Sequence, residues 1–299
     1  MQKLLAYQSY ALPVAIFAVA IGLLFIMAVW AATPRPVVRA DSADNGEVVL
    51  IPLLSATSTP PEPLPPARIP AIPVAREYVE VVDGCGPYFE GPCVNVRGGA
   101  GEGFPIVQKL RMGAVVEVDR AVFAEGRTWY HITHDNEWLR FPERAGNNWY
   151  ITAEYVRHFI DDSAVEIPVG SPAEGDKSII VDRSDQKLYA YEGDMLQHTI
   201  DISTGLRVTP TPRGIFTVYK KTPSRYMQGP IAGISDQYYD LPGVPWNLYF
   251  TAEGAVVHGA YWHDKFGQPW SHGCVNLAPG DAQRVYQWTE VGTQITVRD

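Results

Sequence analysis

The stretch that decides the fold is KSIIVDRSDQKLYAYEGDMLQHTIDIST, residues 177–204. It is rich in β-branched and aromatic residues, which fit pleated strands, and EGD at 192–194 supplies turn chemistry. We expect two strands about this turn, followed by another strand. The stretch therefore predicts a β fold rather than a helical one.

The rest of the segment 175–299 continues in the same way. Four further stretches have the length and composition of short strands, namely TPTPRGIFTVY, WNLYF, AVVHGAY and TQITVR. Only PGDAQRVYQWTEV, residues 279–291, places apolar side chains at helical spacing, through Ala282, Val285 and Tyr286. Pro279 and Asp281 suit the start of this helix. Residues 175–299 are predicted to form a mainly β domain with one short helix.

An apolar stretch near the N-terminus, residues 11–32, has no charged side chain between Lys3 and Arg35. About 20 apolar residues are what a membrane-spanning helix requires, so we expect residues 1–34 to form a membrane anchor with a short cytoplasmic tip. A cleavable signal peptide is the alternative, although its apolar region is normally shorter. Basic residues flank the stretch on both sides, so charge does not settle its orientation.

The segment that follows, residues 35–76, contains TPPEPLPPARIPAIP. Proline fixes φ and lacks an N–H group, so this segment is expected to be an extended, solvated stalk. Residues 161–174 are expected to be a second, shorter linker. This arrangement places the later domains away from a membrane, outside the cytoplasm.

Residues 77–160 show short alternating stretches such as AVVEVDRA and WYHITH, with turn residues in GGAGEGFP. They predict a small β-barrel. The stretches VNVR and WYITAEYV, within 94–157, resemble the bacterial Src-homology-3-type (SH3-like) domain. The resemblance implies a module that binds peptidoglycan peptides, and a simple spacer remains the alternative.

The chain has three cysteines, and two of them, Cys85 and Cys93, flank a short loop rich in glycine and proline. In an oxidising compartment they can form a disulfide, and two buried thiols are the alternative. If they pair, Cys274 is left over, and an odd thiol in an exported protein is a candidate reactive group. The net charge of −9 argues against a nucleic-acid partner.

The densest chemistry lies in HGAYWHDKFGQPWSHGCVN, residues 258–276. A thiol attacks as a thiolate, and a nearby imidazole can take its proton. His258 ends a strand-like stretch, and the loop after it is long enough to return to Cys274. His272 lies two positions before Cys274, so in an extended chain both side chains point to the same side.

Thiol activation alone supplies little of an enzymatic rate. A free thiol with a pKa of about 8.5 is a few per cent ionised at pH 7, so complete ionisation gains roughly 30-fold. A preorganised oxyanion site supplies about 3–4 kcal/mol per donor. Gly273 permits a close backbone approach, and we expect its N–H and that of Cys274 to face a substrate carbonyl.

SHGCVN, with HG upstream, resembles the signature of the L,D-transpeptidases, which have the YkuD fold. IIVDRSDQKLYAYEGD, STG, TPRGIF, WNLYF and GDAQRVYQWTEVGTQITV follow in the family's order over 177–298. The resemblance implies Cys274 as nucleophile, His258 as general base and His272 as an active-site partner. Gly259 would orient His258 through its carbonyl group, and Ser271 would brace the loop.

The resemblance also implies the reaction, which is acyl transfer on peptidoglycan without a metal or organic cofactor. A tetrapeptide stem loses its terminal D-Ala and is joined to an acceptor amine, a step in cell-wall synthesis and cell shape. A carbapenem adduct is expected at Cys274. Asn276 stands where many members have arginine, so the donor contacts are less defined; we expect substrate contacts from Asn276, His263, Trp246 and Tyr226.

Other functions fit the same residues less well. Zinc accepts histidine and cysteine ligands, but the spacing matches none of the usual paired patterns. In NlpC-type peptidases the cysteine precedes the histidine, and in sortases a later arginine follows the cysteine. An L,D-carboxypeptidase, which uses water in place of the acceptor amine, and an inactive wall-binding adaptor are the remaining alternatives.

Overall fold

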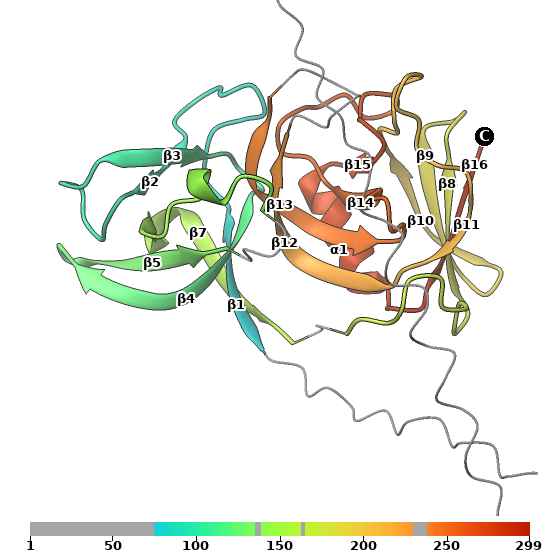
Figure 1. Cartoon of the computed structure of the whole chain (residues 1–299), viewed down its shortest axis with the longest axis horizontal. Helices are drawn as coiled ribbons and strands as arrows, with labels where there is room; N and C mark the ends of the chain where they lie inside the picture. Colours follow the sequence, from blue (N-terminus) through green and yellow to red (C-terminus); the bar gives the residue numbers. More distant parts are fainter. Residues whose placement is uncertain (1–74, 135–138, 163–164, 230–237) are drawn as a thin grey trace, which may run out of the picture. The chain divides into compact units, whose positions relative to one another are not determined.

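A computed structural model describes residues 75–134, 139–162, 165–229 and 238–299 (Figure 1). The expected anchor, residues 1–34, and all but the last two residues of the proline-rich stalk, 35–76, lie outside this part of the chain. Within the ranges just given, no helix is both long and apolar enough to cross a bilayer. Part of the expected linker 161–174 also lies outside them.

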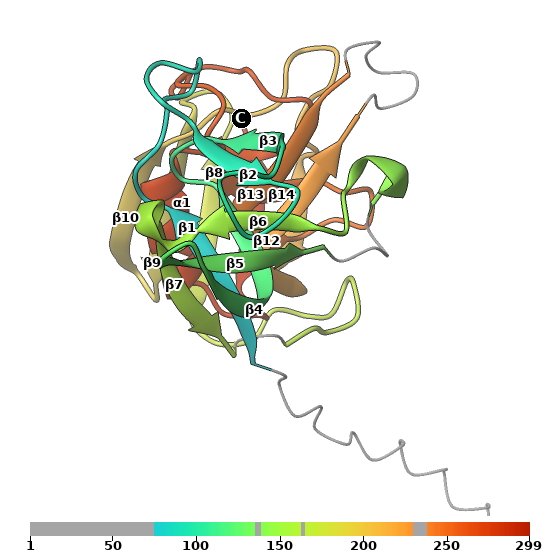
Figure 2. The same ribbon diagram turned by 90° about the vertical axis from the view of Figure 1, so that its left-hand side faces the viewer.

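The N-terminal part of the described chain is a seven-stranded sheet with the order β3-β2-β6-β5-β4-β1-β7. Figure 2 shows β4, β5 and β6 side by side in this sheet. Its strands are β1 (Arg76–Val81), β2 (Val94–Arg97), β3 (Ile106–Leu110), β4 (Val115–Ala124), β5 (Arg127–Thr133), β6 (Trp149–Thr152) and β7 (Val156–Asp161). Two 3-10 helices, η2 (Pro142–Arg144) and η3 (Ala153–Tyr155), lie in its connections. The sequence pattern of short strands is confirmed here.

The C-terminal part contains two more sheets, with the orders β10-β9-β8-β16-β11 and β12-β13-β14-β15. The first is made of β8 (Lys177–Asp182), β9 (Lys187–Glu192), β10 (Met195–Asp201), β11 (Gly214–Thr217) and β16 (Gln294–Arg298). The second is made of β12 (Lys220–Gln228), β13 (Asp240–Tyr249), β14 (Val256–Gly259) and β15 (Val275–Leu277). The prediction of a mainly β domain with one short helix is confirmed.

The opening stretch 177–204 folds into β8, β9 and β10, and its EGD turn joins β9 to β10 as predicted. The prediction placed the additional strand after the strand pair that flanks EGD. In the structure the additional strand is β8, which comes before that pair, and a turn at 183–186 that the pattern did not mark joins it to β9. The Asp182 carboxylate accepts hydrogen bonds from the N–H groups of Ser184 and Asp185, at 3.1 and 3.0 Å. Such a side chain-to-backbone turn reverses the chain.

The one α-helix among the described residues, α1 (Pro279–Trp288), lies against β13 and β14 (Figure 1). Pro279 occupies its first turn, where a missing N–H costs nothing. Ala282, Val285 and Tyr286 are buried, as the helical spacing predicts. They join the largest hydrophobic core, which also includes Ile179, Val257 and Leu277 from the two C-terminal sheets.

The N-terminal sheet packs directly on the C-terminal sheets. Tyr78 and Val115 belong to the same buried core as the C-terminal residues around α1. Ser224 donates a hydrogen bond of 2.6 Å to the Val115 carbonyl. A Cβ atom at Gly243, where φ is +71°, would lie only 2.7 Å from that carbonyl oxygen. Glycine at 243 therefore permits the close approach of the two sheets.

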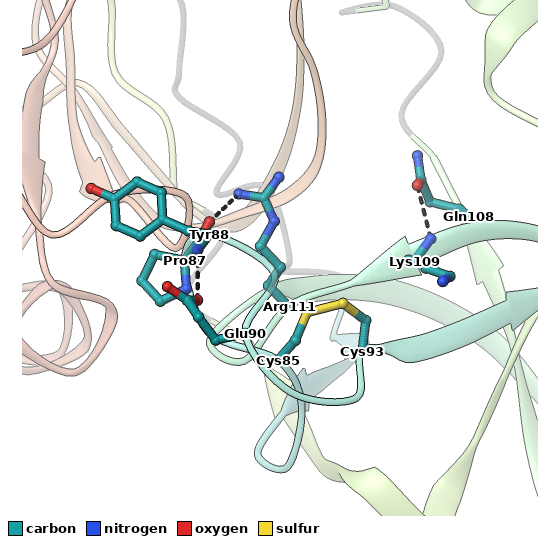
Figure 3. Close-up of a disulfide and its surroundings, with 8 residues drawn as sticks. All are labelled: Cys85, Pro87, Tyr88, Glu90, Cys93, Gln108, Lys109 and Arg111. Carbon is teal, nitrogen blue, oxygen red and sulfur yellow. Dashed lines mark hydrogen bonds between the residues drawn. A yellow bond between two sulfur atoms is a disulfide. The ribbon is translucent and has the colours of Figure 1, made fainter.

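A disulfide joins Cys85 to Cys93 and closes the loop between β1 and β2 (Figure 3). The two cysteines are therefore joined in a disulfide and are not two buried thiols. Cys274 is the free cysteine; the residue is partly exposed and packs against the cluster of Tyr219, Tyr249 and Val256.

Candidate active site

The parallel pairing of β14 and β15 brings the histidine and the cysteine together. Val257 pairs with Val275, and His258 pairs with Asn276. Cys274 directly precedes β15, so the long connection from 260 to 273 leaves β14 and returns beside it. Two residues 16 positions apart thus reach the same edge of one sheet.

His258 is held as a neutral imidazole with one nitrogen available. Its side chain is buried, and Nδ1 donates a hydrogen bond of 3.0 Å to the Gly259 carbonyl oxygen. Since a carbonyl can only accept, the ring proton lies on Nδ1, and Nε2 carries the lone pair. Nε2 is buried and has no hydrogen-bond partner among the residues described. Burial lowers the pKa of His258 to about 4, so the ring is neutral at pH 7.

Gly259 is required by the packing around the base. A Cβ atom there would lie 2.8 Å from the Pro245 side chain and 3.2 Å from the Pro279 backbone. The absence of a side chain therefore allows β14 to approach both β13 and α1. The same residue supplies the carbonyl that orients His258.

The turn before the cysteine is organised by Ser271 and Gly273. The Ser271 hydroxyl donates a hydrogen bond to the Cys274 carbonyl and accepts one of 3.1 Å from Gly273 N–H. Gly273 has φ of +122°, a backbone conformation that residues other than glycine rarely adopt. Ser271 thus holds the turn before Cys274, and glycine at 273 is favoured by the backbone conformation.

The expected pair of oxyanion donors is present only in part. Gly273 N–H is bound by Ser271 Oγ in this structure, so it does not point freely toward a substrate. Cys274 N–H, by contrast, has no hydrogen-bond acceptor within the described part of the chain.

Cys274 opens onto a cleft of about 980 Å³. His258, Ser271, His272 and Gly273 share this cleft, and His272 is exposed in it. Burial raises the pKa of the Cys274 thiol, and the positive charge of Arg225 acts in the opposite direction. The resting pair is therefore a thiol and a neutral imidazole rather than an ion pair.

The four residues expected to contact substrate lie in different places in the structure. Tyr226 lines the cleft. Asn276 also lines it but is buried, and its side-chain amide lies 2.8 Å from Nε2 of the buried His263. His263 accepts Lys265 N–H at Nδ1 and is not among the lining residues, so it braces the loop.

Trp246 does not reach the cleft. Its ring packs against Phe159 and Tyr286, with centroid distances of 5.4 and 5.3 Å, in the core beneath α1. Its aromatic character alone could not distinguish a pocket residue from a core residue, because both sites favour large apolar rings.

The cleft also contains residues that the sequence did not single out. Arg225 lies on β12, and Trp262, Trp270 and Tyr239 add aromatic surface. Arg111 and Arg140 come from the N-terminal region 77–160. No sequence pattern marks Arg111 or Arg140 as a cleft residue. Their place in the cleft follows from the packing of the region 77–160 on the C-terminal sheets.

In the four described ranges, no set of three or more histidine, cysteine, aspartate or glutamate residues is placed to hold a metal ion. His258, His272 and Cys274 line one cleft, and the Cys274 thiol donates a hydrogen bond of 3.9 Å to the Gly254 carbonyl. A neutral histidine and a cysteine in one cleft are the groups that a cysteine acyltransferase uses.

Comparison with known proteins agrees with this class. Residues 176–297 match the YkuD family model, described as the L,D-transpeptidase catalytic domain. The putative L,D-transpeptidase YqjB of Bacillus subtilis (strain 168) is 26% identical over 139 residues, 44% of this chain and 77% of that protein. The chain therefore contains an L,D-transpeptidase catalytic domain, and it is an enzyme.

Two solved structures are also similar to the chain. One is an L,D-transpeptidase from Mycobacterium smegmatis, with 22% identity, a TM-score of 0.40, and coverage of 62% of this chain and 99% of that one. The other is the catalytic domain of the E. faecium L,D-transpeptidase acylated by ertapenem. It has 26% identity, a TM-score of 0.37, and coverage of 42% of this chain and 98% of that one.

Proposed function

We propose that this protein is a peptidoglycan L,D-transpeptidase in which Cys274 carries the acyl group. The donor is a tetrapeptide stem, and the bond broken joins its third residue to the terminal D-Ala. The observation that carries the proposal is that Cys274 and a neutral His258, whose Nε2 has no partner among the described residues, line the same cleft.

The first half-reaction forms a thioester. His258 Nε2 takes the thiol proton as the sulfur attacks the donor carbonyl, and the same proton passes to the departing amine. D-Ala leaves, and the stem remains attached to Cys274. Because the pKa of His258 is lowered to about 4, the base is already neutral before substrate binds at pH 7.

The second half-reaction transfers the stem to an acceptor amine. The amine attacks the thioester, its proton moves to His258 Nε2 and then to the departing sulfur, and the free thiol is restored. A 3,3-type cross-link is the product if the acceptor is the side-chain amine of a neighbouring third residue. Water in place of the amine would give an L,D-carboxypeptidase.

Charge that develops on the carbonyl oxygen during both steps needs a donor. Cys274 N–H is the backbone group suited to this, since no described residue accepts it. One preorganised donor contributes about 3–4 kcal/mol to transition-state stabilisation. Gly273 N–H would contribute only by leaving Ser271.

The remaining segments support a role in the cell envelope. We propose that residues 11–32 anchor the chain in a membrane with the catalytic domain outside the cytoplasm. Residues 77–160 would form the SH3-like module that binds wall peptides. The short strands of residues 77–160 form one seven-stranded sheet, which supports a separate module. The Cys85–Cys93 disulfide supports a location outside the cytoplasm, because disulfides are typical of an oxidising compartment.

Product analysis tests the main proposal. The protein is incubated with a defined disaccharide-tetrapeptide, and the products are separated by mass spectrometry. A cross-linked dimer with release of D-Ala is the expected result. A trimmed tripeptide alone would establish the carboxypeptidase instead, and unchanged substrate with folded protein would contradict both. Binding of residues 77–160 to purified sacculi, in the full chain and in a variant lacking them, tests the module.

A further inference from the structure

Arg111 links the N-terminal region to the catalytic cleft. It directly follows β3 and makes an isolated bridge with Cys85 of the disulfide. Although it lies far from the catalytic residues in the sequence, it lines the same cleft as Cys274.

The guanidinium of Arg111 is held in place by its neighbours. Nη1 donates a hydrogen bond of 2.9 Å to the Pro87 carbonyl, as Figure 3 shows. Its central carbon lies 3.9 Å from the centre of the Phe89 ring and 5.6 Å from that of Tyr261. Pro87 and Phe89 belong to the loop closed by the disulfide, and Tyr261 belongs to the catalytic domain. The cation is therefore fixed between the two parts of the protein.

The positive charge at this position lacks a matching acid. A guanidinium has five N–H donors, and the described residues accept only one of those of Arg111. No carboxylate in the same part of the chain forms an ion pair with it. Glu90 is the acidic residue whose charge acts on the pKa of Arg111, but its carboxylate accepts a hydrogen bond of 2.9 Å from Tyr88 N–H and forms no ion pair with Arg111.

A half-buried cation of this kind favours an anionic ligand. Burial lowers the pKa of Arg111, which reflects the cost of removing water from the charge. A carboxylate offers two oxygens that match the planar donors of a guanidinium, and such paired hydrogen bonds are strong. Arg225 and Arg140 add positive charge to the cleft wall, against Asp240 and Glu253.

We propose that Arg111 binds a carboxylate of the stem peptide, so that the N-terminal region forms part of the substrate site. This inference rests on the proposed function, because it takes the peptide as the occupant of the cleft. It gives the region 77–160 a direct role in substrate selection, in addition to any role in wall attachment.

The disulfide loop is the positioning element for this contact. Besides holding Pro87 and Phe89 against Arg111, the loop presents Tyr88, whose hydroxyl donates a hydrogen bond of 2.7 Å to Asp264. Asp264 lies in the connection between His258 and Cys274. The loop thus contacts both the proposed carboxylate site and the segment that joins base to nucleophile.

The experiment measures binding without turnover. The full-length chain with Cys274→Ser is titrated with a disaccharide-tetrapeptide by calorimetry. Two analogues are titrated in parallel, one with the terminal carboxylate amidated and one with the remaining carboxylates amidated. Each titration is repeated with Arg111→Gln, Arg111→Lys and the control Arg97→Gln. Arg97 is a suitable control because it also donates to backbone carbonyls in the N-terminal region, at Glu102 and Phe104, without lining the cleft.

The expected result is that Arg111→Gln weakens binding about tenfold or more, whereas Arg97→Gln leaves it unchanged. Arg111→Lys should recover part of the loss, because the charge is retained. The analogue that binds equally well to the protein with Arg111 and to the Arg111→Gln variant identifies which carboxylate Arg111 contacts. Equal loss for every analogue, no loss with Arg111→Gln, or no binding at all would overturn the proposal.

The two proposals fail in different ways. If carboxylate-dependent binding persists while the unmodified protein never acylates Cys274, the transferase proposal fails and the Arg111 site stands. If Cys274 acylates normally and Arg111→Gln has no effect on binding, only the Arg111 site fails.

Discussion

His258 on β14 and Asn276 on β15 are register partners in a parallel strand pair. This pairing determines where the base and the nucleophile meet, because Cys274 lies two residues before Asn276. Asn276 in turn contacts His263, which is buried in the loop between them. One strand pair and one buried polar contact thus define the geometry of the site.

The thiol of Cys274 should be the only site of acylation. We expect a carbapenem to add once to the intact protein, and we expect the adduct to disappear in Cys274→Ser, because the other two cysteines form a disulfide. Intact-protein mass spectrometry followed by peptide mapping measures this. An adduct that persists in folded Cys274→Ser would contradict the assignment of the nucleophile.

Replacing the base should affect chemistry more than folding. His258→Gln is expected to lower the acylation rate about 10²-fold or more, because Nε2 is the proton acceptor. His263→Gln should leave a larger share of the rate but reduce stability by about 1–3 kcal/mol, because it breaks buried hydrogen bonds. Stopped-flow acylation and urea unfolding measure the two effects. Equal rate losses in two folded variants would mean that the base is misassigned.

The acid limb of the rate profile should reflect the burial of His258. The pKa of this histidine is lowered to about 4, so the base stays neutral as pH falls from 7 to 5. The rate should therefore not show the loss near pH 6.5 that an exposed imidazole would give. Because the pKa of Cys274 is raised by burial, the rate should still increase above pH 8. A half-maximal rate near pH 6.5 would contradict a buried neutral base.

Stability should decrease in mild acid. His134, His258 and His263 each have a pKa lowered to about 4, with burial as the main cause. Between pH 6.5 and 4 the unfolded chain binds protons that the folded chain does not, so the free energy of unfolding falls as pH falls. For the fully buried His258 the loss approaches about 3 kcal/mol.

Urea unfolding at pH 7 and pH 5 measures this loss. His134→Gln should reduce the difference between the two midpoints, whereas His158→Gln, on the surface, should preserve it. Identical midpoints at both pH values would contradict the expected uptake of protons on unfolding.

The glycine after the base should not accept a side chain. Gly259→Ala is expected to destabilise the fold by about 1–3 kcal/mol, because its Cβ would approach the Pro245 side chain and the Pro279 backbone. Gly280→Ala is the matched control, since no atom lies within 4 Å of a Cβ at that position. Thermal unfolding of both variants, with acylation of Cys274, measures the effect. A Gly259→Ala protein as stable as the control would show that β14 can move away.

The sequence by itself determined the local elements of the catalytic domain. The EGD turn and the helix at 279–288 followed from turn chemistry and apolar spacing. Cys274, His258 and Gly259 could be selected because their residue types and order carry a chemical signature. The sequence did not mark the turn at 183–186, which depends on hydrogen bonds from backbone N–H groups to Asp182.

Only the tertiary structure decided which side chains share the cleft. Trp246 was expected there and lies in the core, whereas Arg111 reaches the cleft from the other region of the chain. The pattern along a chain records which face of a strand is apolar, but it does not record which distant surface that face meets. That meeting follows from the docking of whole sheets. The burial of His258 is also a property of the folded chain, and it lowers the pKa of this histidine and leaves it a neutral base.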